Sequence, residues 1–143
     1  MPRTPDPLRV FAKQASDPKL ARLFTLLARR RTTFEKMYAR FAESILHHRQ
    51  VREGRAAHLT PKQQRWIDDA RRAAGQANRD LLATPRSLSD ADRARAILAS
   101  ERMQLSFDER MLPGYAPEDQ PLAAELLRFQ RETIELIELA LDS

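Results

Sequence analysis

The sequence predicts an all-α protein, specifically an antiparallel four-helix bundle with a long first helix and a proline-rich N-terminal arm. Three observations predict this fold. Apolar residues recur at steps of three, four and seven, which is the period of helices that pack side by side. Prolines and capping residues mark the helix ends, and only 3 glycines occur in 143 residues. The connections between the helices are short, which favours antiparallel neighbours.

Residues 1–15 contain three of the 9 prolines and are expected to form the arm, with room for a short helical turn at residues 8–13. Residues 16–143 then form a single domain, because no linker divides them. A chain of this length can bury about two thirds of its unfolded surface. We expect its four helices at about residues 17–53, 61–83, 88–112 and 119–141.

The first helix has a clear start, because Ser16 or Asp17 can cap it and Pro18 is tolerated in its first turn. At 1.5 Å per residue it would be ~50 Å long. We therefore expect it either to project from the bundle or to break near His47 and His48. Its apolar positions form one sustained seam, made of Leu20, Phe24, Leu27, Phe34, Tyr38, Phe41 and Ile45.

The other helices are delimited by similar signals. The second opens at Thr60–Pro61 and is stopped before Pro85. The third starts at Ser87 or Ser89, and the spacing from Ser89 to Asp92 is that of a capping box. The fourth repeats the same apolar rhythm. The expected inward face of the second helix is made of Trp66, Ile67, Ala70, Ala73, Ala74, Ala77 and Leu81.

The charge is unevenly distributed along the chain. The formal net charge is +5, but residues 1–82 hold 18 Lys and Arg against 8 Asp and Glu, while residues 83–143 hold 7 against 12. Arginine is the better bidentate phosphate ligand, and it outnumbers lysine 21 to 4. The basic residues fall into rows on the first two helices and their connection. These are Arg22, Arg29, Lys36 and Arg40, then Arg49, Arg52, Arg55 and Lys62, then Arg65, Arg72 and Arg79.

Such rows contact backbone phosphates rather than base edges, so they predict sequence-independent, salt-sensitive binding of RNA or DNA. Two other interpretations stay open. A basic row opposite an apolar stripe is also the solvent side of an ordinary amphipathic helix. The acidic last helix could instead dock on the basic first helix of the same or another copy, as in an adaptor or chaperone. Its acidic residues are Glu125, Glu132, Glu135, Glu138 and Asp142.

Two charged residues interrupt apolar stripes: Arg31 in the first helix and Glu101 in the third. Because an unpaired buried charge is very costly, we expect a buried ion pair between them. Setting the register of the helices is the main role expected for this pair, and a polar ligand pocket is one alternative. In the other alternative the stripe is only partly buried there, and both residues reach solvent. Met103, Phe107 and Met111 form a second apolar strip on the third helix, which predicts either a doubly covered helix or a partner interface.

Several functions are excluded or disfavoured. The chain has no cysteine, and its glycines are too few for a phosphate-binding loop. The spacing of His47, His48 and His58 matches no metal motif, and no catalytic constellation is present, so we expect no metal, no cofactor and no enzyme activity. No apolar run reaches the ~18 residues of a membrane span, and the start lacks a signal-peptide core. A cytoplasmic location is therefore expected.

In its helical architecture and basic rows, the chain resembles the small all-helical subunits of multi-subunit CRISPR effector complexes. No sequence motif carries this resemblance. It implies a helical bundle that stacks within a ribonucleoprotein assembly and places basic faces against guide or target backbones. The function expected from the sequence is therefore a non-enzymatic, oligomeric or assembly-bound subunit that binds nucleic acid without sequence specificity.

Overall fold

A computed structural model describes residues 6–53, 61, 65, 68–69, 72, 76, 79–80, 83 and 88–142, without the side chains of residues 52 and 53. Its elements are α1 (Pro7–Gln14), α2 (Pro18–Glu53), α4 (Asp90–Met111), the short 3-10 helix η1 (Leu112–Gly114) and α5 (Gln120–Asp142). The described residues between 61 and 80 are helical too. No strand occurs in the described part, which confirms the all-α prediction.

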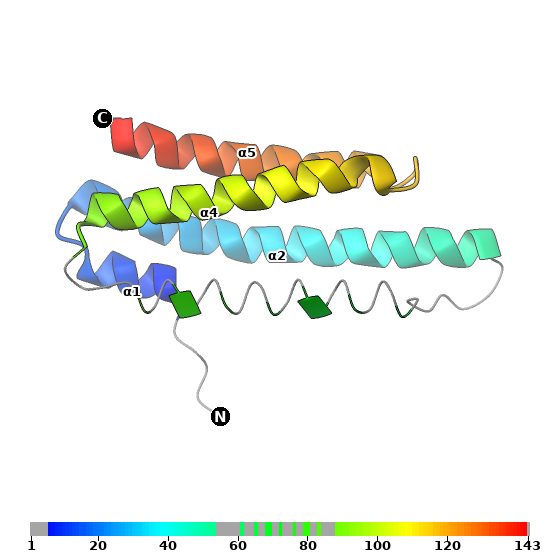
Figure 1. Cartoon of the computed structure of the whole chain (residues 1–143), viewed down its shortest axis with the longest axis horizontal. Coiled ribbons are helices and arrows are strands. Elements are labelled where there is room, and N and C mark those ends of the chain that lie inside the picture. The colour runs from blue at the N-terminus through cyan, green and yellow to red at the C-terminus, as the bar shows by residue number, and fades with distance from the viewer. Residues whose placement is uncertain are drawn as a thin grey trace, which may run out of the picture.

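The long helix α2 organises the described part of the molecule. It contacts α1, α4 and α5, and α4 also contacts α5. Figure 1 shows that α4 runs in the same direction as α2, whereas α5 returns in the opposite direction. The short α1 also runs opposite to α2 and packs beside its first turns.

Helix α2 starts and continues much as expected. The Asp17 carboxylate accepts a hydrogen bond from the backbone N–H of Lys19 (2.9 Å), and the Asp17 carbonyl accepts one from Ala21 (2.9 Å). The helix is unbroken for 36 residues, so the alternative of a break near His47 and His48 is wrong. Its far end extends beyond the connection between α4 and α5 (Figure 1).

Within the expected arm, the helical turn expected at residues 8–13 is present and extends over residues 7–14 as α1. Asp6 caps this helix by accepting from the N–H of Leu8 at 3.0 Å. Leu8 and Phe11 are only 2% and 3% exposed, and the Phe11 ring meets Phe24 edge-on at 5.8 Å. Two apolar residues three apart lie on one face of even a two-turn helix, so burying that face holds α1 in the core. Residues 1–5 lie outside the described part.

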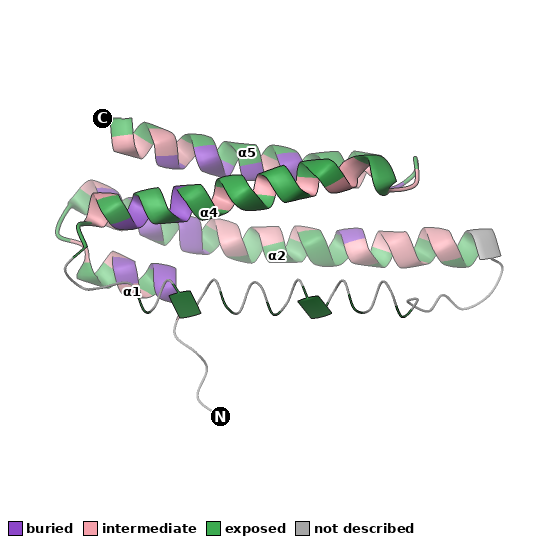
Figure 2. Ribbon diagram, in the orientation of Figure 1, coloured by how far each residue is buried: buried purple, intermediate pink, exposed green. Residues whose placement is uncertain are grey.

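The described residues form two clusters of buried core residues, of unequal size. Figure 2 shows most of the buried positions near the end of the molecule that holds α1. The first cluster is made of Leu8, Phe11, Leu20, Leu23, Phe24, Leu27, Ala28, Ala94, Ile97, Leu98, Ile134 and Ile137. The second cluster, further along α2, is made of Phe41, Ala123 and Leu126.

The ends of α4 and α5 lie within two residues of their expected positions. Ser89 caps α4 as predicted, since its hydroxyl oxygen accepts a hydrogen bond from the N–H of Asp92 at 3.1 Å. The predicted inward face of the 61–83 helix lies outside the described residues. Every described residue between 61 and 83 is exposed.

Candidate nucleic-acid interface

The outer row of α2, formed by Arg22, Arg29, Lys36 and Arg40, is exposed along its whole length. These residues are seven, seven and four apart, which places them on one side of the helix, and they span ~27 Å. The row lies opposite the side that contacts the core. None of the four side chains forms a hydrogen bond or an ion pair with another described residue. A phosphate could therefore bind them without first displacing an internal carboxylate.

The outer row of α2 has a defined end. Glu43 is exposed three residues after Arg40, on the same side of the helix. Arg49 is half-buried and already has an interaction partner. The side chains of Arg52, Arg55 and Lys62 lie outside the described part of the chain. The exposed cationic surface that can be followed on α2 thus covers residues 22–40.

The second predicted row differs from the first. Its three arginines, Arg65, Arg72 and Arg79, are exposed. Three aspartates of the same segment are exposed too: Asp68, Asp69 and Asp80. Arg72 forms an ion pair with Asp69. Arg79 donates to Gln76 (2.9 Å), and Gln76 donates to Asp80 (2.8 Å). The described part of this row is therefore balanced in charge and internally bonded.

The acidic helix α5 pairs with the inner side of α2. Arg30 donates from Nε to the hydroxyl oxygen of Thr133 (2.8 Å) and from Nη2 to the carbonyl oxygen of Phe129 (3.0 Å). Its guanidinium lies 3.9 Å from the centre of the Phe129 ring and 3.7 Å from the Glu132 carboxylate. The acidic helix thus neutralises Arg30, which was absent from the predicted site, and leaves the outer row of α2 unneutralised.

Arg31 and Glu101 are both half-buried, which agrees with the alternative of a partly buried stripe. Burial raises the pKa of Glu101, the charges of Arg31 and then Arg30 lower it, and the charge of Asp108 raises it. Asp108 also accepts a hydrogen bond from the buried Gln130 at 2.6 Å. These groups form a polar layer between the two core clusters, and no enclosed ligand cavity is described beside them.

An aromatic hydroxyl lies near the same layer. Burial raises the pKa of Tyr115 to about 12, with smaller contributions from Tyr38 and Asp108. The Tyr115 ring packs edge-on against Phe41 at 5.1 Å. Tyr115 therefore stays neutral near pH 7 and serves the packing of the second cluster.

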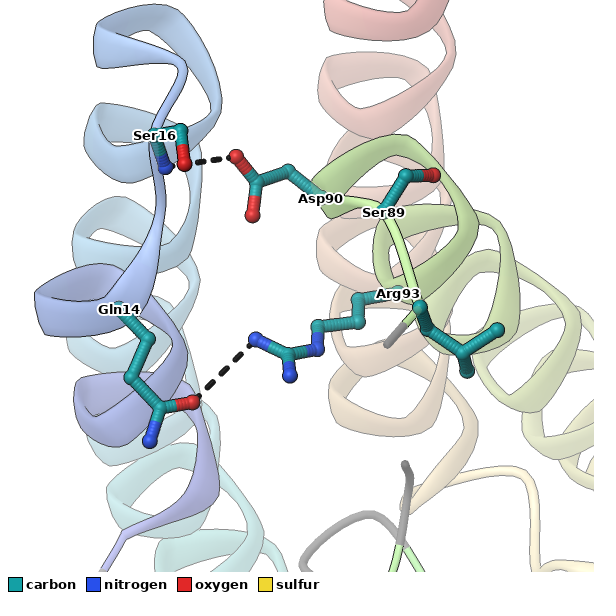
Figure 3. Close-up of a pocket in the computed structure, with 6 residues that line it drawn as sticks. Gln14, Ser16, Ser89, Asp90 and Arg93 are labelled. Atoms are coloured by element: carbon teal, nitrogen blue, oxygen red, sulfur yellow. Dashed lines mark hydrogen bonds between the residues drawn. The ribbon is translucent and has the colours of Figure 1, made fainter. Parts of the chain in front are cut away.

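An open pocket of about 480 Å³ lies where α1 meets the start of α4 (Figure 3). There the Asp90 carboxylate accepts hydrogen bonds from the N–H groups of Ser16 (2.9 Å) and Asp17 (3.0 Å). Arg93 is only 4% exposed, lies over the Phe11 ring and donates to Gln14 at 3.3 Å. The Arg93 contacts fasten α1 to α4, and the Asp90 contacts fasten the α1–α2 connection to α4. The sequence signal for the Arg93 contacts was a charge at a core position of α4.

The predicted partner interface on α4 is largely exposed. Met103 and Phe107 are 75% and 41% exposed, and Met111 is half-buried. The strip is therefore a surface in this chain and is not the second buried side of a central helix within the described residues.

Comparisons with known protein families, with curated proteins and with solved structures gave no match. In the described residues, no group of three or more His, Asp or Glu side chains is placed to hold a metal ion. None of the described helices is both long enough and apolar enough to cross a membrane. Inferences about function therefore rest on the surface of this chain.

Proposed function

We propose that this protein is a non-enzymatic helical module that binds the phosphate backbone of RNA or DNA without sequence specificity, through the outer row of α2. One observation carries the proposal: four exposed cations without internal partners lie along ~27 Å of one continuous helix. Contacts of this kind fix a protein on the backbone and carry no base information.

The spacing of the cations supports the proposal. Seven residues of helix advance ~10.5 Å. Phosphates on one strand of a duplex are about 3.4 Å apart along the axis. Arg22, Arg29 and Lys36 are therefore about three nucleotide rises apart along the axis of a duplex that lies parallel to α2.

The proposal includes the arrangement of the helices in the whole bundle. Residues 61–83 would complete an antiparallel four-helix bundle with α2, α4 and α5. In the cell the module would act within a larger, cytoplasmic assembly, as implied by its resemblance to the small helical subunits of CRISPR effector complexes.

The salt dependence of binding tests the proposal. Fluorescence anisotropy would be measured with two unrelated sequences, each single- and double-stranded, at several salt concentrations. Four phosphate contacts predict a slope of log K against log salt near −3.6 on duplex DNA and near −2.8 on single strands, about −0.9 and −0.7 per contact. Affinities should be equal for the two sequences. Absence of binding by micromolar protein at low salt would sink the proposal.

The two basic rows provide a matched control. Arg22→Glu, Arg29→Glu and Lys36→Glu together change the net charge by the same amount, and at the same spacing, as Arg65→Glu, Arg72→Glu and Arg79→Glu. We expect the α2 triple variant to lose about three of four contacts, and so to lower the magnitude of the salt slope by about 2.7 on duplex DNA. The second triple variant should change the slope much less. Equal losses would show that only total charge matters.

A second function, as a protein–protein adaptor, is favoured by the exposure of Met103 and Phe107 on α4. Large apolar side chains rimmed by polar residues are typical of partner surfaces. Both functions can coexist, because the outer row of α2 and this strip lie on different helices.

A further inference from the structure

One exposed stripe of α4 carries no charge for three turns. Its exposed residues three or four apart define what we call the outer α4 face: Ala96, Ala99, Ser100, Met103, Ser106 and Phe107. The neighbouring arginines are engaged elsewhere, Arg95 with Asp92 (2.8 Å) and Arg102 with Glu138 of α5 (2.9 Å). An uncharged exposed stripe of this length is unlike the basic solvent side of α2.

The size of the side chains differs between the two halves of the outer α4 face. Its first half has the small residues Ala96, Ala99 and Ser100, and its second half has the large Met103 and Phe107. Small residues let another helix approach, and large residues fill the space that such an approach leaves. The two halves of this face therefore complement each other.

The two ends of α4 carry charges of opposite sign. The first turn of α4 contains Asp90 and Asp92, and its last turn contains Arg110. Asp92 and Arg110 are exposed and flank the outer α4 face, and both already contact neighbours on their own helix, Asp92 through Arg95 and Arg110 through the Ser106 carbonyl (3.3 Å). Each charge also suits its helix end, because a helix terminus attracts the opposite sign.

We propose that the outer α4 face binds the same face of a second copy, with the two α4 helices antiparallel about a two-fold axis near residue 101. This arrangement places Ala99 opposite Met103 and Ala96 opposite Ser106 and Phe107. It also places Asp92 opposite Arg110 of the other copy. A parallel arrangement would instead place Asp92 against Asp92 and Met103 against Met103. Isologous pairing of this kind is the commonest form of protein self-association.

This inference goes beyond the proposed function, and its test needs no nucleic acid. Sedimentation equilibrium of the full chain should show a monomer–dimer equilibrium in the micromolar range, since one helix pair gives a small interface. Met103→Glu with Phe107→Glu should weaken the dimer by about 30-fold or more, as expected for loss of a central apolar contact. Both side chains are exposed, so circular dichroism should show unchanged helix content.

Leu139→Glu is the matched control, because Leu139 is 67% exposed on α5, outside the outer α4 face. This variant should dimerise like the original chain. A chain that is monomeric at all concentrations would overturn the proposal and leave the face for a different protein. A dimer that survives the Met103→Glu and Phe107→Glu changes would also overturn it.

The chain has no cysteine, so introduced thiols report the orientation directly. Ser100→Cys lies next to the proposed axis and should crosslink to its own copy with a short thiol-reactive reagent. Ala96→Cys should not, because the two positions would be ~15 Å apart along the helices. A mixture of Ala96→Cys and Ser106→Cys chains should form the mixed crosslink. Efficient crosslinking of Ala96→Cys to itself would refute the antiparallel arrangement.

Discussion

The two core clusters hold the two ends of the molecule together in different ways. In the part of the chain that the structure describes, the cluster beside α1 contains 12 buried residues, drawn from α1, α2, α4 and α5. Within the described ranges, the cluster further along α2 contains 3 buried residues, which come from α2 and α5, and half-buried groups such as Phe34 and Tyr115 surround them. Because burial of apolar surface dominates stability, the first end should be the more stable one.

The second end compensates with polar and aromatic contacts. The buried Asp119 precedes α5 and meets Nδ1 of His48 at 2.6 Å. Phe41 packs edge-on against Tyr38 and Tyr115. Such contacts are directional, so this end depends on a few specific pairs, whereas the first end depends on many interchangeable apolar contacts.

The largest expected effect tests this difference directly. Phe24 is completely buried, and Phe24→Ala should lower the free energy of unfolding by about 4–5 kcal/mol, near the upper end for such changes. Phe41→Ala should cost about 3 kcal/mol, because fewer buried neighbours surround the resulting cavity. Urea denaturation followed by circular dichroism gives both values. Equal losses would contradict the inferred difference between the two ends.

The His48–Asp119 contact should have a smaller effect. Removing either side chain leaves the other without its partner, and a hydrogen bond that includes a charged group contributes about 1.5–3 kcal/mol. A double-mutant cycle with His48→Ala and Asp119→Ala should give a coupling energy of about 1–2 kcal/mol. Hydrogen exchange should show that the α2 amides around His48 open more readily in both variants, while those around Phe24 do not. Additive losses would show that the contact contributes little.

The smallest expected effect concerns the polar layer between the clusters. Since burial raises the pKa of Glu101, the folded state holds this proton more tightly than the unfolded state. Ionised Glu101 therefore destabilises the fold as the pH rises above its ordinary pKa of 4.5. Glu101→Gln should be slightly more stable than the original chain at pH 7 and lose that advantage near pH 4. A variant that is less stable at pH 7 would show that Arg31 outweighs burial.

The helices were predictable from the sequence because their signals are local. Asp17 and Ser89 cap helices as expected, and the period of apolar residues located α2, α4 and α5. The docking of α1 was missed because Leu8 and Phe11 span a single turn, too short to show a period. Their burial depends on surfaces of other helices, which local patterns do not describe.

For the candidate interface, the exposure of the outer row of α2 followed from its place opposite the apolar seam. The difference between the two basic rows required the positions of individual partners, such as Asp69 beside Arg72. His48 and Asp119 are 71 residues apart, so only the folded chain brings them together. Arg93, like Arg31, is a charged residue at a core position of its helix, so its burial was predictable from the sequence.

The continuity of α2 has a consequence for the size of its proposed ligand. A helix without a hinge keeps its charges at fixed intervals, so the bound strand must follow the protein. The outer row then spans about eight base pairs of a duplex whose axis lies along α2, from ~27 Å at about 3.4 Å per base pair. Shorter strands would lose contacts one at a time. Longer strands would bind further copies of the protein end to end. The length of the outer row of α2 would then set the distance between neighbouring copies.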